Sequence, residues 1–195
     1  NTNWTLDGAD LNLEALKQAP SSKKQSRKLF YNIHDRNTDL GESYDFLILF
    51  DVIEHIEDTS SFLESALFHL APGGWIFINV PAISQLSSAY DKAVGHYRRY
   101  NKRMLGNELH MSRLNILDLR YWGMSSVPLL FFRKLLLSGQ TETDQIVESG
   151  FKPPGDFAHS ILRFVMKIET GLISKPPIGT SLLAIAQKKE CVEKH

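Results

Sequence analysis

The pattern of hydrophobic and polar positions is most regular between residues 44 and 82. Two apolar runs, residues 46–50 and 75–80, lie on either side of a segment in which apolar residues recur every three or four positions. The runs are typical of strands, and the recurrence is typical of an amphipathic helix. This order predicts a right-handed βαβ unit with a parallel sheet. Because both runs are almost wholly apolar, we expect both strands to be buried on two faces.

Similar patterns extend the prediction along the chain. Further strands are expected at residues 2–9, 28–34, 114–122 and 180–187. Helices are expected at residues 13–19, 58–70, 102–110 and 157–172. Asn12 and Asn101 each precede one of these helices and are expected to cap it, because their side chains can accept backbone N–H bonds. Strands alternating with helices predict an α/β fold.

Composition narrows the class of protein. The 195 residues fit one domain, and 22 basic and 22 acidic residues cancel, which argues against a general affinity for polyanions. The only cysteine, Cys191, excludes an intrachain disulfide and suits a reducing compartment. Residues 1–10 lack the basic and apolar regions of a signal peptide. We therefore expect a cytoplasmic protein.

Polar side chains follow both runs of the βαβ unit. Asp51, Glu54 and His55 come directly after the first run, and Asn79 lies near the end of the second. Ligands of parallel sheets bind at the carboxyl ends of the strands. The pattern therefore predicts a functional site formed by these residues.

The sequences YDFLILFDVIEHIED and LAPGGWIFINVPA closely resemble the fourth and fifth strands of class I S-adenosylmethionine-dependent methyltransferases. GADLNLEALKQA resembles that family's second strand and helix, and TSLLAIAQ its seventh strand. The resemblance implies a doubly wound, mostly parallel sheet with helices on both faces and an antiparallel C-terminal strand. Residues 124–178 exceed what the family needs, so we expect a single domain, residues 1–195, with a helical insert there.

The resemblance also assigns cofactor contacts. Asp10 would accept hydrogen bonds from the ribose hydroxyls, because a carboxylate offers two acceptor oxygens; taken alone, it reads as a solvated acid at a helix start. Asp35 would receive the adenine amino group, and the backbone of Arg36 would contact the ring. The expected cofactor is S-adenosylmethionine, and its candidate contacts are Asp10, Leu11, Asp35, Arg36, Phe50 and Asp51.

One part of the family's pattern is absent from the sequence. No G-x-G pattern precedes Asp10, and the chain starts at what resembles the second strand of the family. In the family, the glycine-rich loop lets the backbone approach the methionine end of the cofactor. We therefore expect a fragment lacking roughly 40 or more N-terminal residues, which keeps the adenosine contacts but not the methionine contacts.

Methyl transfer from a sulfonium is an in-line displacement that requires alignment and, for some acceptors, removal of a proton. His55 and His96 are the candidate bases. Together with Asp51 and Glu54 they also resemble the acid-x-x-Glu-His…His arrangement of ubiquinone-biosynthesis O-methyltransferases and small-RNA 2′-O-methyltransferases. There a divalent ion holds two oxygens of the acceptor. Aspartate replaces the usual first glutamate here, and both the base and the metal reading stay open.

The expected activity is O-methylation of a small-molecule or lipid-intermediate acceptor. Residues 84–103 interleave tyrosines with cations, but zero net charge favours a lid over an acceptor rather than nucleic-acid binding. The insert is expected to form extra helices packed on the core, or to cover the acceptor pocket, form a dimer surface or contact a membrane surface. Two alternatives are a non-catalytic methyltransferase-like binding module and a nicotinamide-dependent dehydrogenase. No tyrosine has a lysine four residues later, which argues against the short-chain type of dehydrogenase.

Overall fold

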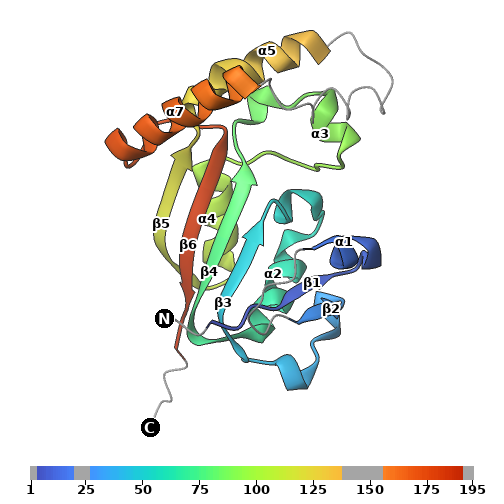
Figure 1. Ribbon diagram of the computed structural model, residues 1–195. Coiled ribbons are helices and arrows are strands. Elements are labelled where there is room, and N and C mark those ends of the chain that lie inside the picture. Colours follow the sequence, from blue (N-terminus) through green and yellow to red (C-terminus); the bar gives the residue numbers. More distant parts are fainter. Residues whose placement is uncertain (1–3, 20–26, 138–155, 191–195) are drawn as a thin grey trace.

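The structure of the chain is a computed structural model, which describes residues 4–19, 27–137 and 156–190. Cys191 and the middle of the expected insert lie outside the described residues. Two sheets are present within the described part (Figure 1). The smaller sheet pairs β1 (Gly8–Asp10) with β2 (Lys28–Phe30) in parallel. The larger sheet has the order β3-β4-β6-β5, with strands β3 (Tyr44–Phe50), β4 (Leu70–Pro81), β5 (Leu114–Trp122) and β6 (Ser181–Lys188).

The predicted βαβ unit is confirmed. β3 pairs in parallel with β4, and this register places Phe50 opposite Asn79. The connecting helix α2 (Thr59–His69) begins after Asp58, whose side chain accepts a hydrogen bond from the backbone of Ser61 at 3.0 Å. β4 begins earlier than predicted. The Pro-Gly-Gly segment does not end the pairing but forms an irregularity in the register, where Gly73 has a φ of 76°.

β6 confirms the antiparallel C-terminal strand. It lies between β4 and β5 and pairs antiparallel with both, so the last strand of the sequence is interior to the sheet. β3, β4 and β5 consequently run in the same direction and end at the same edge (Figure 1). This edge therefore collects the polar residues that follow the strands.

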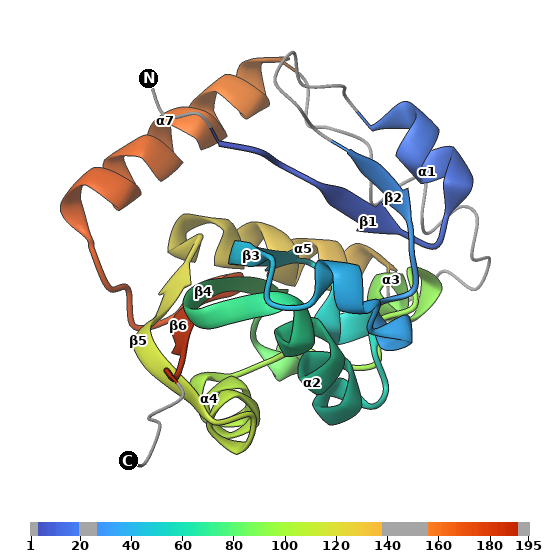
Figure 2. The same ribbon diagram turned by 90° about the horizontal axis from the view of Figure 1, so that it is seen from below.

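Helices α2 and α4 (Lys102–Met111) cover one face of the larger sheet (Figure 2). Asn101 caps α4 and Asn12 caps α1 (Leu13–Gln18), as the sequence predicts. The core between this face and the helices is apolar and almost completely buried, with contributions from Leu49, Leu63, Ile76, Ile78, Leu105, Leu109, Ala184 and Ala186. Short 3-10 helices and α3 (Ala89–Ala93) follow the strands at the carboxyl edge.

The expectation that β3 is buried on two faces is wrong. Phe46, Ile48 and Phe50 alternate along the strand with relative exposures of 48%, 52% and 53%. They point away from α2 and α4; Trp4 stacks on Phe46 with ring centroids 5.7 Å apart, and the Phe77 ring lies beside Phe46 at 6.2 Å. Residues with period 2 share one face of a strand, so this face of β3 is open in the described part of the chain.

The first two strands are also shorter than predicted. β2 ends at Phe30, because Asn32 then caps a 3-10 helix, Ile33–Asp35, by accepting a hydrogen bond from the backbone of His34. The competition of an asparagine side chain for backbone donors ends the extended structure. Among the described residues, β1 pairs only with β2, and β3 pairs only with β4.

In the described part of the insert, two helices, α5 (Val127–Leu137) and α7 (Asp156–Leu172), lie at the carboxyl edge (Figure 1). Glu169 fastens α7 to the chain that leaves β5, because its carboxylate accepts hydrogen bonds from the backbone of Met124 and Ser125, both at 2.8 Å. Within the described ranges, no helix has the length and apolar character needed to cross a bilayer.

Candidate functional site

The backbone of Asp51 occupies the left-handed region just after β3, with φ at 54°. Its N–H donates to the carbonyl of Asn79 at 2.9 Å, and the Asn79 amide donates to Asp51 Oδ1 at 3.0 Å. The indole of Trp122 donates in turn to Asn79 Oδ1 at 2.8 Å. The ends of β3, β4 and β5 are therefore joined by one hydrogen-bonded chain, which fixes the position of Asp51. Non-glycine residues rarely adopt this conformation, and it often marks functional segments.

Glu54 lies in the 3-10 helix Ile53–His55 and is fully buried. Neither of its carboxylate oxygens has a hydrogen-bond partner among the described residues. Burial, with a smaller contribution from the negative charge of Asp51, raises the pKa of Glu54 to about 7. A buried carboxylate without a partner is costly, so this group is suited to receive a proton or a cation.

His55 and His96 meet beside Glu54. Their ring centroids are 4.6 Å apart in an edge-to-face arrangement. The backbone N–H of Tyr97 donates to the carbonyl of Glu54 at 2.9 Å, which holds the two segments together. One potential ligand atom from each of Glu54, His55 and His96 lies within 4.8 Å of the others. We refer to these three residues as the Glu54–His55–His96 cluster.

Asp91 orients His96, and sequence reasoning missed this residue. Its Oδ1 lies 3.1 Å from Nδ1 of His96 and accepts from Nε of Arg99 at 2.7 Å. Its Oδ2 accepts from the backbone and hydroxyl of Ser88 at 2.9 and 3.0 Å. Since Nδ1 of His96 is engaged, Nε2 is the nitrogen available to the cluster. The Ser-x-x-Asp spacing of a capping box was the one signal that pointed to Asp91.

The cofactor candidates that follow β1 are placed at its carboxyl end. Asp10 ends the strand, and its Oδ1 accepts a hydrogen bond from the backbone of Asn12 at 2.7 Å. Leu11 follows it and is exposed. One oxygen of Asp10 is thus fixed by the start of α1, and the described residues supply no partner for the other.

The remaining cofactor candidates follow β2 and β3. Asp35 is exposed at the end of its 3-10 helix, and Arg36 adopts a left-handed backbone with φ at 46°. The guanidinium of Arg36 contacts Glu64 at 3.1 Å and is turned toward α2, so its backbone is the part left for a ligand. Phe50 exposes its ring at the end of β3, beside Asp51.

Three of the four residues considered for a metal site gather in the structure. Asp51 bonds to Asn79 and lies outside the group of converging ligand atoms, whereas Glu54, His55 and His96 converge. One carboxylate and two imidazoles form a donor set that suits a divalent transition ion. The unpartnered oxygens of Glu54 are consistent with this use, and the residues present therefore fit a metal ion.

A sequence profile of a family described as "Methyltransferase domain" matches residues 2–123 of the chain. The chain belongs to the methyltransferase domain family. The match includes β1 to β5 and the whole Glu54–His55–His96 cluster. S-adenosylmethionine is the cofactor of this methyltransferase. A search of curated proteins finds no match.

Solved structures of S-adenosylmethionine-dependent methyltransferases share the fold of this methyltransferase at low sequence identity. The protein from Methanosarcina mazei has a TM-score of 0.56 at 13% identity, and the match covers 96% of this chain and 84% of that chain. The protein from Mesorhizobium loti has a TM-score of 0.55 at 14% identity, covering 94% and 80%. The protein from Archaeoglobus fulgidus has a TM-score of 0.53 at 14% identity, covering 93% and 75%.

Proposed function

We propose that this methyltransferase transfers the methyl group of S-adenosylmethionine to an oxygen atom of a small-molecule acceptor. The observation that carries the proposal is the Glu54–His55–His96 cluster at the carboxyl edge of the sheet. An oxygen acceptor needs a group that takes its proton, and imidazoles are the side chains best suited to this near neutral pH. The cluster supplies two imidazoles beside a fixed strand end.

In this proposal the cofactor lies across the ends of β1, β2 and β3. Asp10 accepts hydrogen bonds from the ribose hydroxyls with its remaining lone pairs, and Leu11 packs beside the sugar. Asp35 and the backbone of Arg36 contact the adenine. Phe50 and Asp51 line the path toward the methionine end. Support comes from the exposure of these residues at strand ends in a chain of this family.

The chemical step is a displacement in which the acceptor oxygen attacks the methyl carbon. The carbon–sulfur bond breaks as the carbon–oxygen bond forms, and its electron pair stays on sulfur to give the neutral thioether. Nε2 of His96 accepts the hydroxyl proton, while Asp91 holds the imidazole through Nδ1. His55 lies beside His96 and is the alternative base. Burial lowers the pKa of His55, and the charge of His96 contributes to the same direction, which favours the neutral form that can accept a proton.

A metal-dependent form of the same reaction is the second candidate, and the unpartnered carboxylate of Glu54 favours it. Glu54, His55 and His96 would hold a divalent ion. When bound, such an ion would act as a Lewis acid on acceptor oxygens and lower the pKa of a hydroxyl. The protein's own contribution would be to orient the ligands, with Asp91 fixing the His96 ring through its second nitrogen.

We also propose that a further strand, carrying a glycine-rich loop, pairs with the open edges of β1 and β3. Support comes from the separation of the two sheets and from the exposed apolar face of β3. Reading the coding sequence upstream of Asn1 tests this proposal. An in-frame glycine-rich strand would support it, whereas an upstream stop codon would contradict it and favour a non-catalytic binding module.

A lipid-intermediate acceptor is the alternative acceptor class. Large apolar side chains are exposed on α5 and α7, among them Phe131, Phe132, Phe164 and Leu172. On α7, the cationic side chains of Arg163 and Lys167 are exposed next to the apolar ones. This combination suits an anionic lipid surface. Sedimentation with phosphatidylglycerol vesicles tests it, because a chain that stays in the supernatant would exclude this class.

Calorimetric titration with S-adenosylmethionine tests the proposed function directly, followed by detection of S-adenosylhomocysteine with hydroxylated acceptors. Binding together with turnover that His96→Ala removes would support it. The protein tested should include any upstream strand. Cofactor binding with methylation of amines only would contradict the proposed methylation of oxygen. The His110→Ala variant is the matched control, since His110 is exposed at the end of α4.

A further inference from the structure

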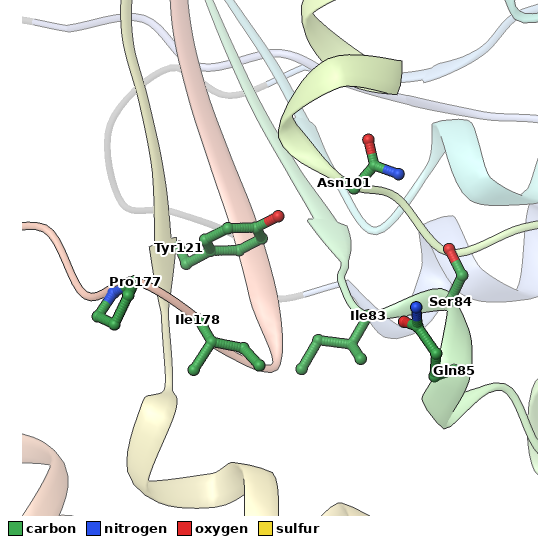
Figure 3. Close-up of a pocket in the computed structure, with 7 residues that line it drawn as sticks. All are labelled: Ile83, Ser84, Gln85, Asn101, Tyr121, Pro177 and Ile178. Carbon is green, nitrogen blue, oxygen red and sulfur yellow. The ribbon is translucent and has the colours of Figure 1, made fainter.

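A pocket lies at the carboxyl edge of the larger sheet (Figure 3), and none of the residues assigned to the cofactor belongs to its lining. Its volume is about 280 Å³, close to the lower end of ligand pockets, which span roughly 300–1,000 Å³. Ile83 from the segment after β4 and Ile178 from the segment before β6 form apolar walls, and Pro177 extends the second wall. The insert therefore contributes one side of this pocket.

The polar lining of the pocket consists of uncharged groups. The amide of Gln85 has no hydrogen-bond partner among the described residues, and the hydroxyl of Tyr121 accepts from the backbone of Lys102, which leaves its O–H free to donate. Asn101 uses its side-chain oxygen to cap α4, so its NH₂ group stays available. None of the lining side chains is charged, and the two lysines beside the lining are already engaged: Nζ of Lys134 donates to the Gln85 carbonyl, and Nζ of Lys102 lies over the Tyr121 ring. Three donors among apolar walls therefore favour an oxygen-bearing ligand without charge.

Ile83 occupies an unusual backbone conformation, with φ at 62°. A β-branched residue in this region is strained, and strain of this kind persists only where the surroundings fix it. Here the N–H of Ile83 donates to the carbonyl of Tyr100 at 3.2 Å, and its carbonyl accepts from the N–H of Leu86 at 2.9 Å. These hydrogen bonds thus hold Ile83, an apolar wall of the pocket, in an energetically unfavourable backbone conformation.

The pocket shares one segment of chain with the Glu54–His55–His96 cluster. The carbonyl of Arg99 accepts from the Ser84 hydroxyl in the pocket wall at 3.1 Å, and the Arg99 guanidinium binds Asp91, which holds His96. Two residues further on, Asn101 lines the pocket itself. A single segment, residues 99–101, therefore contacts both the carboxylate that holds His96 and the lining of the pocket.

We propose that this pocket is the acceptor subsite of the methyltransferase, and that it takes an uncharged, ring-sized molecule carrying a hydroxyl or carbonyl oxygen. The role of the pocket as an acceptor subsite rests on the proposed function. The class of ligand that it binds rests on the lining residues alone. It excludes phosphorylated and carboxylated acceptors from the subsite.

Amide NMR titrations of the 195-residue chain with phenol, benzoate and benzylammonium test the chemistry. Phenol should produce saturable shifts at the backbone amides of Ser84, Gln85 and Ile178. Benzoate and benzylammonium should bind at least about 10-fold more weakly, because each would bury a charge without a partner. Absence of saturable phenol shifts at these amides, or equal affinity for the three probes, would overturn the proposal.

Ile178→Trp should fill the pocket and weaken phenol binding at least about 10-fold, while Ile173→Trp, on a partly exposed residue outside the lining, should leave it unchanged. Gln85→Ala removes a donor without adding bulk and should weaken phenol several-fold. S-adenosylmethionine titration separates the two ideas. Cofactor binding without phenol binding overturns this inference alone, and phenol binding without any oxygen methylation overturns the proposed function while the pocket's ligand class stands.

Discussion

Asp91 and His96 form a carboxylate–imidazole pair at 3.1 Å in which the carboxylate is almost completely buried, with 2% of its residue surface exposed. Burial alone would raise the pKa of Asp91. The hydrogen bonds from His96 and Arg99, together with the charge of Arg99, outweigh it and hold this pKa well below its usual range. An ionised partner fixes the proton of His96 on Nδ1 and leaves Nε2 as the nitrogen that can accept a proton.

Asp91→Asn should therefore lower kcat by about 10²-fold or more, because the imidazole loses its preferred tautomer and orientation. The affinity for S-adenosylmethionine should stay within a factor of about two, since Asp91 is not among the expected cofactor contacts. Steady-state kinetics and ¹⁵N chemical shifts of the His96 ring measure both effects. Asp45→Asn, at an exposed residue near the start of β3, is the matched control. Unchanged ring shifts in Asp91→Asn would refute the positioning role.

Asp10→Ala should weaken cofactor binding strongly. The carboxylate would lose two charge-assisted hydrogen bonds to the ribose, each worth on the order of 1.5–3 kcal/mol. Calorimetry with S-adenosylmethionine measures the loss, and Asp39→Ala, at an exposed acid in the 3-10 helix Thr38–Leu40, serves as the control. Equal affinities of Asp10→Ala and wild type would show that the ribose lies elsewhere.

A chelator separates the two candidate mechanisms. If Glu54, His55 and His96 hold a divalent ion, chelation should abolish turnover, a divalent ion should restore it, and Glu54→Ala should remove turnover while cofactor affinity stays intact. If His96 acts as a simple base, the chelated enzyme should keep full activity and His96→Ala alone should cause the large loss. Direct metal analysis of the purified chain gives an independent reading.

Glu169 should make the docking of α7 dependent on pH. Burial alone would raise its pKa, but hydrogen bonds from Ser125, Met124 and Gly123 outweigh it and lower the pKa below its ordinary value of 4.5. Its stabilising contribution is therefore present above pH 4.5 and is lost as the pH falls through the lowered folded-state pKa. Glu169→Gln should lower the free energy of unfolding at pH 7 by about 1–3 kcal/mol and flatten the acid limb of the stability profile.

Urea titrations between pH 3 and pH 7 measure this effect. Glu57→Gln provides the control, because Glu57 is exposed and lies outside the α7 contact. A wild-type profile with the same acid limb as Glu169→Gln would show that the carboxylate carries no pH-dependent stability.

The elements that sequence reasoning placed well are those whose ends carry a local signal. Leu114–Trp122 matches the predicted strand, and the starts of α1 and α4 follow the asparagine caps. β3 and β4 were identified from apolar runs, but an apolar run does not say whether both faces find partners. The exposure of Phe46 depends on which elements pack against the sheet. The hydrophobic pattern within one strand carries no information about those elements.

The candidate site divides in the same way. Glu54 and His55 follow a strand and were found from that position, and His96 was found from the composition of a resembling arrangement. Asp91 was missed because its role depends on burial and on a contact with His96 across a turn. The separation of Asp51 from the cluster was equally invisible, since it follows from the hydrogen bond that Asn79 donates.

The position of β6 has a consequence for biosynthesis. β6 is synthesised after β4 and β5 and fills the space between them, so both neighbours keep an unpaired edge until Ser181–Lys188 has been synthesised. The nascent chain can complete α2 and the β3–β4 pair early, but the larger sheet closes only after Ser181–Lys188 has left the ribosome. Such late, long-range pairing is slow and leaves strand edges open to other chains, so this protein has reason to depend on chaperones during synthesis.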